Sequence, residues 1–266
     1  ERRDTRLTVA ELINKFGFKV DQSSVTKVNN TINDIKSRAA KMLSAIGVGI
    51  SLTAINALVE EFGAANQQIQ SAVGELENMT DVQDLVLEKA NEARLAYNDM
   101  AGYVSNLVKA GADIFPVDDA MQFTSTVAKL MKTSGRNDSQ IASMMEGFNK
   151  SFQKGIVDSE TLNKMLEQAP ETANILADSL GVAKSQLLTM ASEGTMTVQQ
   201  LKAAFMDSSG AIDAAFSQMD MSVTDALKNV RNKWGLWLAE MDSSLGVTNF
   251  ISRGIVKLTD IALRGL

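Results

Sequence analysis

Cysteine and histidine are both absent from this sequence of 266 residues. Without cysteine the chain has no disulfide bond and no thiolate nucleophile, and without either residue type it has no zinc site of the Cys/His kind. Catalytic triads and general bases built on an imidazole are excluded for the same reason. The chain therefore lacks the residues that most familiar hydrolase mechanisms require.

Proline and aromatic residues are scarce, with two prolines and 5% aromatic residues. Helix formers such as Ala, Leu, Met, Gln and Glu are frequent instead, which argues against a β-sandwich or barrel. We predict an all-α, multi-helix fold in which longer N-terminal helices precede a compact bundle of short helices. The alternating apolar residues of Phe16-Gly17-Phe18-Lys19-Val20 add one short N-terminal strand as a candidate element.

Patterns typical of ligand sites are missing as well. No phosphate-binding glycine loop and no EF-hand pattern occurs, so we predict no cofactor and no metal. The net charge of −6 argues against specific nucleic-acid binding. Five acidic residues invite comparison with a glycosidase pair, but their expected places in the first turns of helices favour capping and interaction with the helix dipole. They are Asp118, Asp119, Asp158, Glu160 and Glu167.

The longest uncharged run comprises the eighteen residues from Met42 to Val59 and follows a polar helix predicted over residues 24–41. Its length approaches that of a membrane span, although several small and polar residues dilute its hydrophobicity. Two interpretations stay open: a buried helix or helix-turn-helix, which we favour, and a membrane-active segment. The residues that would contact a membrane or a partner are Met42, Ile46, Ile50, Leu52, Ile55 and Leu58.

Capping residues and glycines divide the rest of the chain into helices. We predict a polar helix over residues 66–77, and a longer one that opens with the capping box Thr80-Asp81-Val82-Gln83 and runs towards Ala110. From Pro116 to Met206 short helices alternate with stops in a compact domain. Their predicted starts are Pro116, Asn137, Asp158, Pro170, Ser185 and Thr197, and their predicted stops include Gly135, Gly155, Gly181 and Gly194. The predicted divisions are residues 1–110, 111–210 and 211–266.

A last well-defined amphipathic helix is predicted from Ser222 to about Met241. Its apolar face would comprise Val223, Ala226, Leu227, Val230, Trp234 and Trp237. The pair Trp234 and Trp237 would either contact a partner or a membrane interface, or pack against the next helix. The basic residues Lys228, Arg231 and Lys233 are interpreted as part of a solvated face.

The segment from Met165 to Phe205, MLEQAPETANILADSLGVAKSQLLTMASEGTMTVQQLKAAF, combines a proline-opened helix, a short helix closing in ASEG and a capped helix. Together with the residues back to Ala120, it resembles the N-terminal domain of phage tail tape measure proteins. FGFKVDQSSVTKVNNTINDI, near the start, is similar to the opening of many members of that family. The resemblance covers about three quarters of the chain.

This resemblance implies a non-enzymatic virion structural protein, encoded by a phage or prophage, that works in tail assembly. Tail tube subunits would assemble around it, its length would set tail length, and it would leave the tube at DNA ejection. Implied partners are tail tube proteins, tail tip or baseplate proteins, tail assembly chaperones, further copies of the chain and, during ejection, the host membrane. The implied locations are the tail lumen and, during assembly, the host cytoplasm.

A ruler has to be long, and this chain would span only about 400 Å even as one continuous helix. We therefore expect it to be the compact head of a longer protein, with the ruler helices beyond Leu266. The alternative functions are a membrane-active channel component and a cytosolic α-helical scaffold or adaptor. A cell-wall hydrolase has no credible site in these residues.

Overall fold

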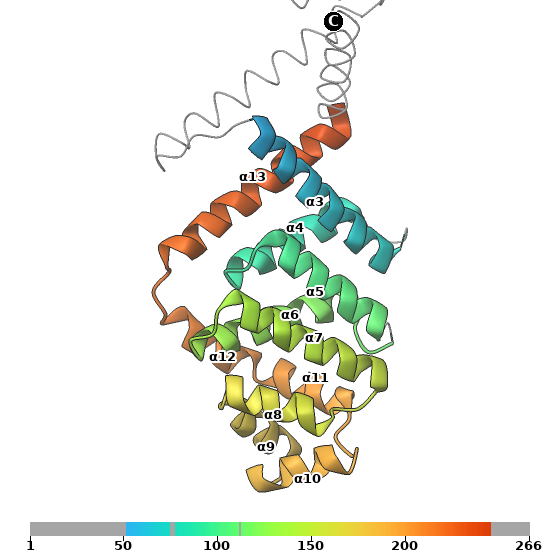
Figure 1. Ribbon diagram of the computed structural model, residues 1–266, viewed down its shortest axis with the longest axis vertical. Helices are drawn as coiled ribbons and strands as arrows, with labels where there is room; N and C mark the ends of the chain where they lie inside the picture. Colours follow the sequence, from blue (N-terminus) through green and yellow to red (C-terminus); the bar gives the residue numbers. More distant parts are fainter. Residues whose placement is uncertain (1–51, 75–77, 112, 246–266) are drawn as a thin grey trace, which may run out of the picture. The chain divides into compact units, whose positions relative to one another are not determined.

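The computed structural model describes residues 52–74, 78–111 and 113–245 (Figure 1). These residues form eleven α-helices and no strand, which confirms the predicted all-α class. Within them, strand-like pairing is limited to one antiparallel bridge between Ile156 and Thr197. The strand predicted at residues 16–20 and the helix predicted over residues 24–41 lie outside the described residues.

The helices follow one another with short connections. The first six are α3 (Leu52–Val73), α4 (Met79–Glu92), α5 (Tyr97–Ala110), α6 (Val117–Thr133), α7 (Asp138–Lys154) and α8 (Ser159–Gln168). The others are α9 (Thr172–Leu180), α10 (Lys184–Ser192), α11 (Val198–Asp207), α12 (Ser209–Ser217) and α13 (Val223–Leu245). Residues Leu58–Ala239 form one compact unit. The predicted boundaries after residues 110 and 210 fall inside this unit, and the three-part division stays a prediction.

Local sequence signals set most of these boundaries. Asn137 and Thr197 each form the predicted type of capping box with a glutamine three residues later, and the Asp158 carboxylate accepts from the Thr161 amide. Besides Gly74, four glycines adopt positive φ angles just after helices, where a side chain would be strained. They are Gly135, Gly155, Gly181 and Gly194, each at or near a predicted stop.

The prediction of one long helix over residues 80–110 was wrong. The chain turns between α4 and α5 at Arg94, a non-glycine residue with φ of 56°. The Leu95 amide donates to the Ala90 carbonyl at 2.8 Å and the Arg94 amide to the Asn91 carbonyl at 3.2 Å, which is the pattern of a Schellman C-cap. Because arginine occupies the position that glycine normally takes, the sequence carried no stop signal there.

Two other helix boundaries also differ from prediction. The cap of α4 is Asn78, whose side chain accepts from the Thr80 amide, so the helix starts before the predicted capping box. Of the separate helix predicted from 66 to 77, residues 66–73 belong to the second half of α3, which ends at Val73 before the left-handed Gly74, and residues 75–77 lie outside the described residues. Helix α12 had no sequence prediction.

Helix α6 is at the centre of the core. Eleven of its seventeen residues are buried, and it packs against α4, α5, α7, α11 and α12 (Figure 1). Its Phe123 makes edge-to-face contacts with four other phenylalanine rings. These rings, from α7, α11 and the segment before α6, are Phe115, Phe148, Phe152 and Phe205. Most of the predicted apolar face of α7, including Met144 and Met145, is buried here, as the sequence predicted.

Candidate functional site

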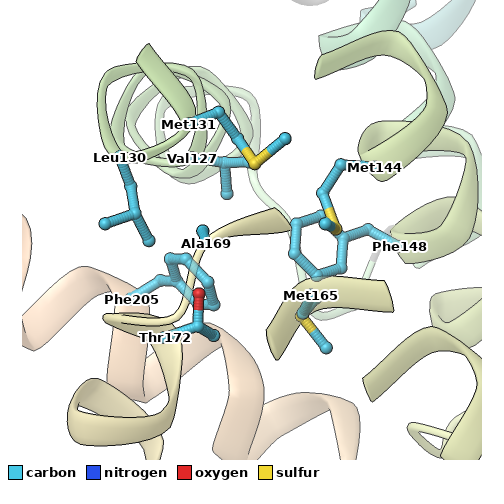
Figure 2. A pocket seen from close by; sticks show the side chains of 9 residues that line it. All are labelled: Val127, Leu130, Met131, Met144, Phe148, Met165, Ala169, Thr172 and Phe205. Atoms are coloured by element: carbon cyan, nitrogen blue, oxygen red, sulfur yellow. The ribbon is translucent and has the colours of Figure 1, made fainter. Parts of the chain in front are cut away.

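The best-defined cavity in the described residues, shown in Figure 2, has a volume of about 10 Å³, whereas small-molecule sites measure some hundreds of Å³. Its lining is apolar apart from the Thr172 hydroxyl and consists of Val127, Leu130, Met131, Met144, Phe148, Met165, Ala169, Thr172 and Phe205. In the same part of the chain, no three acidic residues are placed to hold a metal ion, and no helix is long and apolar enough to cross a membrane.

Two of the five acidic residues considered for a glycosidase pair, Asp119 and Asp158, make structural contacts. Asp158 caps α8, as predicted, and its hydrogen bonds with Lys154 and the Thr161 amide lower its pKa to about 2. Asp119, in the first turn of α6, pairs with Lys202 of α11. The prediction for Glu167 was wrong, because this residue lies in the last turn of α8 and not in its first.

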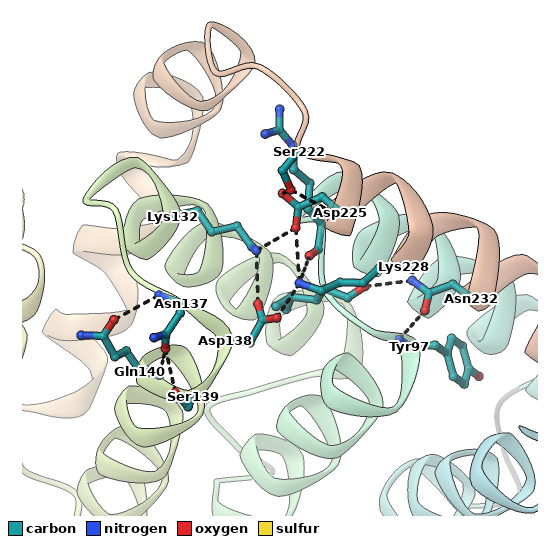
Figure 3. A network of polar contacts seen from close by, with 12 residues as sticks. Tyr97, Lys132, Asn137, Asp138, Ser139, Gln140, Ser222, Asp225, Lys228 and Asn232 are labelled. Carbon is teal, nitrogen blue, oxygen red and sulfur yellow. Dashed lines mark hydrogen bonds and ion pairs between the residues drawn. The ribbon is translucent and has the colours of Figure 1, made fainter. Parts of the chain in front are cut away.

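The main polar cluster joins α6, α7 and α13 (Figure 3). Lys132 contacts both Asp138 and Asp225, with Nζ to oxygen distances of 3.2 and 3.3 Å. Lys228 bridges the same two carboxylates, at 3.3 Å from Asp225 and in a shorter contact with Asp138. Two cations and two anions from three helices thus alternate in one cluster, which we call the polar junction.

Helix ends place three of these four side chains. Lys132 lies in the last turn of α6, while Asp138 and Asp225 lie in the first turns of α7 and α13, so each charge complements its helix dipole. The Ser222 hydroxyl accepts from the Asp225 amide and donates to the Asp225 carboxylate, which fixes the start of α13. The interpretation of Lys228 as part of a solvated face was wrong: its ammonium is largely buried at the junction.

The junction shifts the pKa values of its members. Burial raises the pKa of Asp138 and Asp225, but hydrogen bonds and the charges of Lys132 and Lys228 outweigh it, so both pKa values lie below the usual range. Burial lowers the pKa of Lys228, and its two carboxylate partners reverse this, so its pKa lies above the usual range. The nearby Asp99 behaves differently, since burial and the Asp138 charge raise its pKa.

We expect Asp225→Asn to lower the free energy of unfolding at pH 7 by about 1–2 kcal/mol, because a largely buried charge-assisted contact is lost. Lowered carboxylate pKa values stabilise the fold above the unfolded-state value of about 4, and this contribution disappears as pH falls through the folded-state pKa. The variant should therefore lose less stability than the unmodified chain between pH 6 and pH 3. Urea unfolding at several pH values would measure this, with the exposed Asp178→Asn as control. An Asp225→Asn profile parallel to that of the unmodified chain would contradict it.

A second set of polar contacts ties α13 to the turn between α4 and α5 (Figure 3). The buried Asn232 side chain accepts from the Tyr97 amide at 2.8 Å and donates to the Leu95 carbonyl at 2.8 Å. On the same turn, Arg94 donates to the carbonyls of Met219 and Asp220, at 2.7 and 2.8 Å, just before α13 begins. Arg94, in its unusual backbone conformation, therefore holds the connection between α12 and α13.

The structure does not gather the predicted contact residues into one site. Leu58 is half-buried against the core and Trp234 is half-buried on α13. Met42, Ile46 and Ile50 lie outside the described residues, as do the side chains of Leu52, Ile55 and Trp237. Their proposed membrane or partner contacts stay predictions.

Comparison with known protein families shows to which family this chain belongs. The family model described as "Tape measure protein" matches residues 53–243, which is most of the chain and includes all eleven described helices almost completely. This chain belongs to the tape measure protein family. The match confirms the resemblance found in the sequence. No curated protein and no solved structure matches the chain.

Membership assigns this tape measure region a structural role in a phage tail, as a component of the virion. The family match reaches from α3 almost to the end of α13, so it includes the polar junction as well as the bundle of short helices. Sequence reasoning missed the junction, because Asp225 and Lys228 of α13 are far along the chain from Lys132 and Asp138. The one available signal was Asp138 following a strong N-cap, which places a carboxylate at a helix start but does not identify its partners.

Proposed function

We propose that this protein acts as a tail-length ruler around which tail tube subunits assemble, and that it leaves the tube when DNA is ejected. The observation that supports this is the match of the tape measure family model over residues 53–243. Within this proposal, the compact unit Leu58–Ala239 is a folded head and does not itself measure length.

Helix length supports the division between head and ruler. The longest described helix, α13, has 23 residues and would span about 35 Å, and the helices before it fold back on one another. A deletion inside such a unit disrupts packing rather than shortening a rod. The length-setting residues would therefore lie outside the compact unit.

Electron microscopy of particles with in-frame deletions in the parent gene tests the proposal. Deletions outside the compact unit should shorten the tail by about 1.5 Å per residue removed, the rise of an α-helix. Unfolding the head, for example with Phe123→Ala, should instead reduce the number of assembled tails without changing their length. Tails of unchanged length after deletions on both sides of the unit would overturn the ruler assignment.

The proposed partners are tail tube proteins, tail tip or baseplate proteins, tail assembly chaperones and further copies of this chain. The proposed locations are the tail lumen and, during assembly, the host cytoplasm. Contact with the host membrane during ejection rests on the uncharged run from Met42 to Val59 and on the pair Trp234 and Trp237. A cytosolic scaffold would be favoured over a ruler if the protein were absent from purified particles by mass spectrometry.

A further inference from the structure

The first half of α13 has its apolar side facing outward and its polar side facing the bundle. Val223 and Leu227, two members of the predicted apolar face, are 79% and 43% exposed. The Asp225 and Lys228 side chains, by contrast, are only 14% and 17% exposed, and Asn232 is buried. The predicted apolar face of α13 therefore points outward in these turns.

This orientation is the reverse of that expected for a surface helix, which normally buries its apolar stripe and exposes its charges. The polar junction and the Asn232 hydrogen bonds to the turn between α4 and α5 hold the helix in this rotation. In the described part of the chain, four large apolar side chains are exposed, and three of them lie together here: Met221, Val223 and Leu227. Such a group of exposed apolar side chains marks an interaction surface.

The spacing of the stripe matches a helical partner. Val223 and Leu227 are four residues apart, and the half-buried Val230 follows three residues later. At about 100° per residue these three side chains share one face, opposite Asp225 and Asn232. A spacing of four and three residues is the pattern by which one helix packs lengthwise against another.

The charged residues beside the stripe indicate which charges the partner helix has at its flanks. Arg231 lies on one flank and Lys233 on the other, both exposed, whereas the one carboxylate on these turns, Asp225, faces the junction. Arg231 also pairs with Glu61 of α3. A second copy of α13 placed on this stripe would bring cations against cations, which opposes association. Carboxylates at the flanks of the incoming helix would complement them.

We propose that the stripe Val223, Leu227 and Val230 of α13, together with the exposed Met221 just before the helix, binds an amphipathic helix of another protein, one whose apolar positions are flanked by carboxylates. The inference does not depend on the ruler function, since it follows from exposure, spacing and charge alone. It applies equally to a scaffold.

Two designed helical peptides test the charge preference directly. Both have leucine at the two apolar positions of every heptad, and the flanking positions are all Glu in one and all Lys in the other. Fluorescence anisotropy with the complete 266-residue chain should show the Glu-flanked peptide binding at least ~10-fold more tightly than the Lys-flanked one. Equal binding, tighter binding of the Lys-flanked peptide, or no binding of either would overturn the proposal.

Substitutions locate the binding to α13. Leu227→Asp should weaken binding of the Glu-flanked peptide at least ~10-fold, because it places a carboxylate in the apolar stripe. Leu188→Asp is the matched control, since Leu188 is exposed to a similar degree on α10. Lys233→Glu should reduce the preference for the Glu-flanked peptide while leaving the unfolding midpoint unchanged.

Three results would contradict the α13 assignment. Leu188→Asp could weaken binding as much as Leu227→Asp, which would show that the peptide binds elsewhere. Lys233→Glu could leave the peptide preference unchanged. Sedimentation could show a dimer of the chain that Leu227→Asp dissociates, and the stripe would then bind a second copy.

Discussion

Phe123→Ala is expected to lower the free energy of unfolding by about 4 kcal/mol, because it removes a fully buried ring from the middle of the core. The ring centroid of Phe123 lies 5.2 to 5.7 Å from those of four other phenylalanines, all in edge-to-face geometry. Such pairs contribute beyond the area that they bury. The remaining void would border α6, α7 and α11 at once, so no single helix can move to fill it.

Urea denaturation monitored by circular dichroism would measure this loss as a lower unfolding midpoint. Leu188→Ala is the control, because the Leu188 side chain is partly exposed on α10 and its removal should change the stability by less than about 1 kcal/mol. Phe123→Leu, which keeps most of the buried volume, should fall between the two. A midpoint for Phe123→Ala equal to that of the control would contradict the central position of this ring.

The helices between residues 116 and 206 were predicted well, because the residues that start and end them lie only a few positions away in the sequence. Asn137, Asp158 and Thr197 cap helices through side chains that reach only three residues ahead. Gly155 and Gly181 end helices because glycine adopts the left-handed backbone conformation without strain, whatever contacts the rest of the chain makes. Fold class and most helix boundaries between residues 116 and 206 therefore followed from short windows of sequence.

The orientation of α13 could not be predicted in the same way. Its apolar periodicity placed Val223 and Leu227 on one face, but contacts of Lys228 with Asp138 and of Asn232 with Tyr97 turn that face outward. These partners lie on other helices, and a single sequence does not show which distant residues meet. The break at Arg94 was missed for a related reason, since its conformation is held by carbonyls just before α13. Tertiary contacts set both the orientation of α13 and the break at Arg94.

The candidate interaction surface was only partly visible in the sequence. The periodicity identified the apolar face of α13, including Val223, Leu227 and Val230, but did not show whether that face is buried or exposed. Trp234 and Trp237 were singled out as contacts, whereas the exposed stripe that carries the inference lies before them. A helical wheel shows which residues share a face. Whether that face is buried or exposed depends on which face of the helix packs against the rest of the protein.

Gly235→Ala is expected to lower the free energy of unfolding by about 2–3 kcal/mol, because the added methyl group would overlap the Phe62 ring of α3. That ring is buried and stacks on Tyr97 with a centroid distance of 4.9 Å and an interplanar angle of 9°. Tyr97 in turn donates its backbone amide to Asn232, three residues before Gly235. Displacing Phe62 would therefore disturb a closed set of contacts among α3, α5 and α13.

Gly63→Ala is the matched control, and its expected effect has the opposite sign. Gly63 lies on α3 next to Phe62, and a methyl group there would meet no atom within 4 Å. Alanine is the better helix former, so this variant should be more stable by about 0.5–1 kcal/mol. Thermal unfolding of both variants would compare the same chemical change on the two helices. If both became more stable, α13 would not be packed against Phe62, and the rotation that exposes Val223 and Leu227 would lose its support.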